Sequence, residues 1–84
     1  MVGRRRPTLR LLAMRDIEAV DDDEPNTLTK DSGEMYDIVG PVSAVEGSSV
    51  TFALEDRAVE VRLNGHDNHV EVGSRGRAWG MLVG

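Results

Sequence analysis

The sequence predicts an all-β protein, folded as a small five-stranded antiparallel barrel, and two patterns in residues 39–84 carry that prediction. Apolar residues recur at every second position, with polar or small residues between them, in the sets Val50, Phe52, Leu54 and Val59, Val61, Leu63. A period of two is typical of half-buried strands. Polar or glycine-bearing turns separate the strands, at residues 46–49, 55–57, 64–67 and 73–76.

The length and composition limit what can stabilise this barrel. With 84 residues and no cysteine, the chain fits one domain that has neither disulfides nor a thiolate metal site. Folding a chain of this size buries only about 60–65% of the surface that its unfolded form exposes. No apolar run is long enough to span a bilayer, and residues 1–12 lack the apolar core of a signal peptide. We therefore expect a cytoplasmic protein with no membrane association.

Charge divides the chain into three parts. Residues 1–15 carry five arginines and no acid, residues 16–37 carry nine acids and one lysine, and residues 38–84 are nearly balanced. Residues 1–7 are expected to form a basic arm, which is either a solvated terminus or a phosphate-contacting arm. The net charge of −5 and the preference for arginine over lysine fit a halophile-like composition, and a GC-rich genome explains the arginine preference equally well.

Residues 8–84 are expected to form the single domain, with an acidic loop at residues 21–33. This segment combines repelling acids with Pro25 and Gly33, and we therefore expect a mobile surface loop. Its consecutive acids lack the alternating spacing of a calcium-binding loop, so no metal is expected there. Residues 34–45 follow as the first barrel strand, and Gly40-Pro41 within it predicts a bulge or a sharp bend.

Four strands, VGPV at residues 39–42, VTFALED at 50–56, AVEVRLNG at 58–65 and VEVGSRGRAWGMLVG at 70–84, resemble the middle of an OB-fold domain. The likeness is to the branch seen in replication protein A and in the anticodon-binding domain of some tRNA synthetases, and it covers a little over half the chain. It implies a five-stranded barrel. OB barrels carry many unrelated functions, so the resemblance alone does not fix a function.

The fifth strand has to come from elsewhere, because the chain stops at Gly84. Residues 9–20, LRLLAMRDIEAV, are similar to the basic-apolar last strand of this family, so the N-terminal segment is expected to close the barrel in a permuted order. The apolar positions fit a helix face as well as a strand face, so a helix padding an open barrel remains an alternative. An open edge could instead pair with another chain or a second copy.

The sequence offers no set of residues for catalysis or cofactor binding. It contains no nucleophile elbow, phosphate loop or zinc-protease motif, so we expect neither an enzyme nor a bound cofactor. The two histidines, His66 and His69, follow the turn-forming pair Asn64-Gly65 and are expected to be two exposed loop histidines with no metal.

The resemblance implies that single-stranded nucleic acid would lie across basic and aromatic side chains on the outer face of the barrel. The outward positions of the second and third strands offer Arg62 and no aromatic residue. The last strand places Arg77, Trp79, Met81 and Val83 on one face, and a Trp79 covered by the N-terminal segment or the acidic loop is the alternative to an exposed one. The candidate nucleic-acid-binding residues are therefore Arg62, Arg75, Arg77, Trp79 and Tyr36.

Two functions follow from this reasoning. The first is a nucleic-acid-associated module, acting as a weak single-strand binder or as an accessory subunit of a nucleic-acid-processing complex. The second is a protein-interaction or structural barrel that makes no contact with nucleic acid. An acidic surface is only weak evidence against the first, because stacking and close hydrogen bonds persist at high salt.

Overall fold

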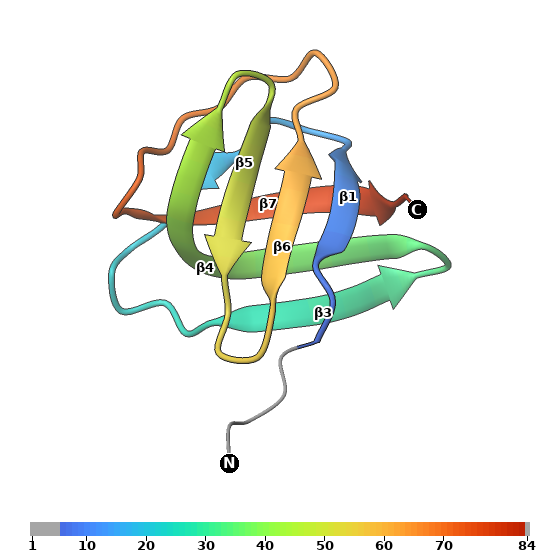
Figure 1. Cartoon of the computed structure of the whole chain (residues 1–84), viewed down its shortest axis with the longest axis horizontal. Helices are drawn as coiled ribbons and strands as arrows, with labels where there is room; N and C mark the ends of the chain where they lie inside the picture. The colour runs from blue at the N-terminus through green and yellow to red at the C-terminus, as the bar shows by residue number, and fades with distance from the viewer. Residues whose placement is uncertain (1–5, 84) are drawn as a thin grey trace.

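A computed structural model describes residues 6–83, which form seven strands and no helix (Figure 1). No helix long and apolar enough to cross a membrane occurs in this part of the chain. The strands are β1 (Leu9–Ala13), β2 (Glu18–Ala19), β3 (Thr27–Ser32), β4 (Met35–Glu46), β5 (Ser49–Ala53), β6 (Ala58–Arg62) and β7 (Arg75–Leu82).

Five of these strands form a closed ring. The sheet runs β7-β1-β6-β5-β4, and β4 pairs with β7 to complete the circle. In Figure 1, β5, β6 and β1 form one layer, and β7 crosses behind them together with the first half of β4. The predicted all-β barrel is therefore confirmed, and its architecture is consistent with an OB-like fold.

The N-terminal segment closes the barrel, as the permuted order predicted. β1 lies between β6 and β7, with Leu11 opposite both Val61 and Leu82. The expectation of a purely antiparallel barrel is wrong, because β1 and β6 are parallel. A ring with an odd number of strands cannot alternate in direction all the way round, so a closed five-stranded barrel must contain at least one parallel pair.

β4 serves both layers of the barrel because it bends. Residues from Met35 to Pro41 pair with β7, whereas Val42 to Glu46 pair with β5 across a register shift between Val42 and Ala44. The change of partner comes directly after Pro41, but Gly40 and Pro41 themselves keep a regular register with β7, so the irregularity lies at Val42–Ala44 and not at the predicted Gly40-Pro41 position.

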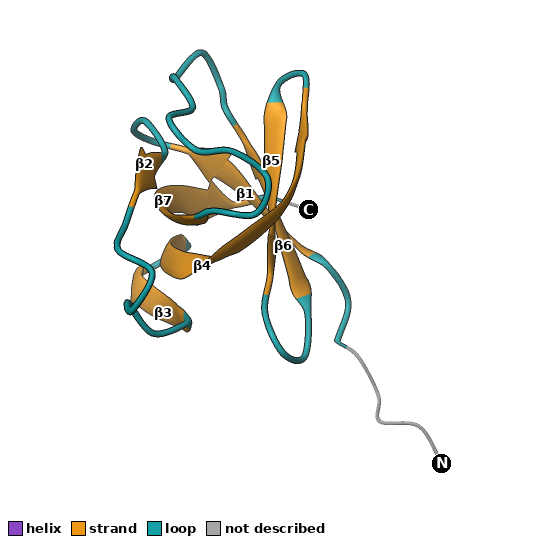
Figure 2. Cartoon of the chain, turned by 90° about the vertical axis from the view of Figure 1, so that its left-hand side faces the viewer, coloured by secondary structure: helices purple, strands orange, loops and turns teal. Residues whose placement is uncertain are grey.

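The segment predicted as a loop at residues 21–33 is only partly a loop. Residues 27–32 form β3, which pairs with the first half of β4. Since β7 pairs with the same residues of β4, β3 must lie along the opposite edge. The threonines of this segment and cross-strand neighbours such as Ile38 favour a strand. Asp31 is compatible with the strand because its side chain is exposed. Figure 2 shows β3 and β2 at the same side of the molecule, outside the ring.

The core contains the residues that the period of two predicted. Phe52 is the largest fully buried side chain, and the inward residues of β1, β4, β5, β6 and β7 surround it. Leu54 and Leu63 are partly buried at the ends of the core. The buried residues that pack together in this core are Leu11, Ala13, Ile17, Ile38, Val42, Val50, Phe52, Val59, Val61, Val70 and Ala78.

Candidate functional site

The outer face of β7 carries three of the five candidate residues, Arg75, Arg77 and Trp79. They point outward because the intervening Gly76, Ala78 and Gly80 are buried and face the interior. Small inward residues allow the barrel wall to approach closely, since a Cβ on Gly80 would lie 2.6 Å from the carbonyl oxygen of Leu12. The predicted register of this strand is therefore confirmed.

Arg77 is engaged by a carboxylate of the neighbouring strand. Its Nε donates to Asp37 Oδ1 at 3.1 Å and its Nη2 donates to Asp37 Oδ2 at 2.7 Å. These hydrogen bonds raise the pKa of Arg77, so the guanidinium is firmly charged. The pair is bidentate, and Arg77 must weaken it before it can bind an external anion.

Trp79 lies half-buried between the two segments that the sequence suggested could cover it. Its indole Nε1–H donates to Asp31 Oδ2 of β3 at 2.9 Å. The guanidinium of Arg15, which follows β1, lies 4.5 Å from the ring centroid, within the range of a cation–π contact. One edge and one face of the indole are thus engaged by exposed side chains that can move.

A groove runs beside Trp79 on this outer face. It has a volume of about 280 Å³ and combines an aromatic wall with charges of both signs. Its lining residues are Arg15, Asp16, Glu18, Val20, Arg77, Ala78 and Trp79. Arg75 lies farther along the strand, where its Nη2 donates to Asn26 Oδ1.

Arg62 and Tyr36 do not belong to this groove. Arg62 ends β6 and lines a separate groove of about 430 Å³ with Arg10, Leu12 and Glu60. Tyr36 packs against the core from the inward side of β4, opposite Gly80. Three of the five candidate residues therefore lie together on β7, and the other two lie elsewhere on the barrel.

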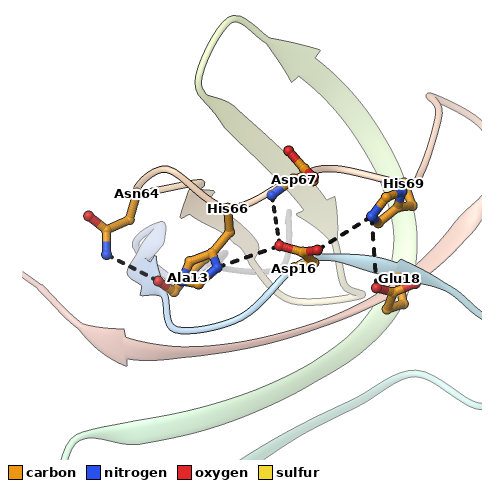
Figure 3. A network of polar contacts seen from close by, with 7 residues as sticks. All are labelled: Ala13, Asp16, Glu18, Asn64, His66, Asp67 and His69. Atoms are coloured by element: carbon orange, nitrogen blue, oxygen red, sulfur yellow. Dashed lines mark hydrogen bonds and ion pairs between the residues drawn. The ribbon is translucent and has the colours of Figure 1, made fainter.

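Sequence reasoning missed a polar network on the turn before β2. Asp16 receives a hydrogen bond from the backbone N–H of Asp67 at 2.8 Å, and its two oxygens lie 3.5 Å from His66 Nδ1 and from His69 Nε2 (Figure 3). The hydrogen bond from Asp67 is the main reason why the pKa of Asp16 is lowered, and the nearby His69 and His66 contribute. Both histidines therefore contact Asp16. Because Asp16 lies 50 or more residues earlier in the sequence, no local pattern indicated this contact.

These features define the protein as a small closed all-β barrel, consistent with an OB-like fold, with a mixed-charge aromatic groove on its outer face. No family model, curated protein or solved structure matches the chain. The function must therefore be argued from the groove itself.

Proposed function

We propose that the protein is a nucleic-acid-associated module that binds single strands weakly in the groove beside Trp79. The observation that carries this proposal is the position of the only tryptophan, half-buried on the outer face of β7 between Arg15 and Arg77. Stacking a base on an aromatic ring contributes roughly 1–3 kcal/mol. The resemblance of four strands to the replication protein A and anticodon-binding branch of the OB fold supports the same function.

A base can compete with Arg15 for the face of the indole. An exposed cation–π contact contributes about 0.5–1 kcal/mol, which is less than a stacked base supplies. Arg15 is exposed, so once displaced it is free to approach a phosphate. The exchange replaces a weak internal contact by a stronger external one.

The carboxylates around the groove keep the expected affinity low. Asp37 forms an ion pair with Arg77, Asp31 accepts a hydrogen bond from the indole N–H, and Glu18 lines the groove. These charges oppose an approaching phosphate, so few counterions are released on binding. The affinity should therefore depend on stacking and change little with salt.

The test is a titration of the intrinsic Trp79 fluorescence with single-stranded DNA and RNA oligonucleotides at low and molar salt. We expect the fluorescence to be quenched at both salt concentrations. The affinity should fall only slightly as the salt concentration rises. Asp37→Asn should strengthen binding several-fold by freeing Arg77, and Trp79→Ala should abolish the anisotropy change of a labelled oligonucleotide. Arg62→Ala, on the other groove, is the matched control and should bind normally. The absence of quenching at both salt concentrations would refute the proposal.

A second candidate function is a protein-interaction module, and the edge of β3 favours it. Within residues 6–83, β3 pairs only with β4, so its other edge is free to accept a strand. Both edges of β7 are occupied, by β1 and β2 on one side and by β4 on the other, so β7 offers no such edge. Lys30 and the register shift after it restrict such pairing. A molecular mass that rises with concentration, without oligonucleotide binding, would favour this function.

A further inference from the structure

Asp16, Glu18 and His69 are brought together by the backbone. Ile17 forms a parallel bridge with Asn68, in which the Ile17 N–H donates to the Asp67 carbonyl and the His69 N–H donates to the Ile17 carbonyl, both at 2.9 Å. The Ile17 side chain is fully buried in the core. Side chains alternate along an extended segment, so the residues on either side of Ile17 face away from the core, towards solvent.

The distances between the three side chains leave space for an ion. His69 Nε2 lies 3.5 Å from Asp16 Oδ2 and 4.0 Å from Glu18 Oε2 (Figure 3). One ligand atom from each residue lies within 4.8 Å of the other two. Direct N–H···O hydrogen bonds are about 2.7–3.2 Å long, so these contacts are too long for them. Ligands arranged tetrahedrally around Zn²⁺ at about 2.0–2.1 Å lie about 3.3–3.4 Å apart, which is close to the 3.5 Å between His69 and Asp16 and shorter than the 4.0 Å between His69 and Glu18.

We propose that Asp16, Glu18 and His69 form a binding site for a first-row divalent cation such as Zn²⁺. One imidazole nitrogen and two carboxylate oxygens are a donor set that suits Zn²⁺ and its neighbours, whereas Mg²⁺ and Ca²⁺ prefer oxygen alone. Three protein ligands leave one tetrahedral position for water or for an external ligand.

The surroundings of Asp16 orient it for this role. The backbone N–H of Asp67 binds Oδ1 at 2.8 Å, which turns Oδ2 towards His69. Outer hydrogen bonds of this kind fix ligand orientation in metal sites. His66 Nδ1 lies 3.5 Å from Oδ1, the oxygen that faces away from the triad, which is too long for a direct hydrogen bond, so His66 lies outside the proposed site. Glu18 is the most exposed of the three ligands, with a side chain 63% exposed, and can rotate to close the remaining 4.0 Å.

The site has two properties that make it easy to detect. The chain contains no cysteine and only two histidines, so nitrogen or sulfur ligands elsewhere contribute little background binding. Asp16 and Glu18 also line the groove that Trp79 borders, so a paramagnetic ion such as Co²⁺ bound there would quench the tryptophan fluorescence.

The experiment measures the binding of Zn²⁺ and Co²⁺ to the untagged full-length protein by calorimetry and by Trp79 fluorescence. We expect one ion per chain, a visible Co²⁺ spectrum of low coordination number and a raised thermal midpoint in Zn²⁺. Asp16→Asn, Glu18→Gln and His69→Gln should each weaken binding at least tenfold. Asn at position 16 retains an oxygen that can accept the Asp67 N–H, so this variant tests the charge with little disturbance of the turn.

His66→Gln is the matched control, because it makes the same change three residues away in the same loop. It should bind Zn²⁺ within about twofold of the wild type, which is a smaller effect than the 10–100-fold of a lost ligand or essential outer partner. Equal weakening by His66→Gln and His69→Gln would overturn the three-ligand assignment. Binding that all three ligand variants retain would overturn the site itself. Neither result depends on whether the groove binds nucleic acid.

Discussion

Gly80 of β7 and Leu12 of β1 approach so closely that a Cβ on Gly80 would stand 2.6 Å from the Leu12 carbonyl oxygen. The obstructing atom belongs to the backbone of the strand that closes the barrel, so no side-chain rotation can relieve the clash. Gly76 is similarly confined, with its hypothetical Cβ 2.8 Å from Val70 Cγ1. The two glycines set how closely β7 packs in the wall.

Gly80→Ala should therefore destabilise the barrel by about 1–3 kcal/mol, the usual cost of forcing extra atoms into a packed interior. Gly40→Ala is the control, because its new Cβ would meet the end of the flexible Leu54 side chain at 3.0 Å. Urea unfolding, followed by far-ultraviolet circular dichroism, compares the two. A Gly80→Ala protein that is no less stable than Gly40→Ala would contradict the predicted role of this contact.

Removing β1 should open the barrel, whereas removing the arm before it should not. Deletion of residues 1–8 removes the exposed Arg6–Asp56 ion pair, and surface pairs of this kind contribute only about 0–1 kcal/mol. Deletion of residues 1–13 also removes Leu11 and Ala13 from the core and leaves unpaired one edge of β6 and the part of β7 that β1 covers. We expect the first variant to unfold cooperatively and the second to be unfolded or to associate through its free edges. A monomeric, cooperatively folded second variant would show that β1 is dispensable.

Asp16 should contribute stability that is lost in acid. Its pKa is lower in the folded protein than in the unfolded chain, so the contribution is complete above the unfolded value, about 3.9, and disappears as the pH falls through the folded value. The difference in urea midpoint between the wild type and Asp16→Asn should therefore be present at pH 5 and shrink as the pH falls below about 4.

The matched control for this pH series is Asp22→Asn, which changes an exposed acid in the turn at residues 22–23. At pH 5 we expect the urea midpoint of Asp22→Asn to differ from that of the wild type by less than the midpoint of Asp16→Asn does. If the midpoint difference caused by Asp16→Asn stayed constant from pH 5 to pH 2, the lowered pKa of Asp16 would be contradicted. All measurements are made without added metal, so that ion binding does not contribute.

The sequence determined the features that depend on near neighbours in the chain. The alternation around Phe52 and along β7 assigned the inward and outward faces correctly, because the direction of side chains in a strand repeats every two residues whatever the strand pairs with. Turns such as those at Gly47-Ser48 and Asn64-Gly65 were predictable for the same reason, since they express local backbone preferences.

Only the tertiary structure decided which strands meet. The insertion of β1 between β6 and β7 fixes the parallel pair, and β3 became a strand because β4 offered it a free edge. Ring closure then set the register that pairs Arg77 with Asp37 and places His69 beside Asp16, across 40 or more residues. A pattern of period two specifies a face but no partner, so contacts between distant strands, and the sites built from them, arise only when the barrel closes.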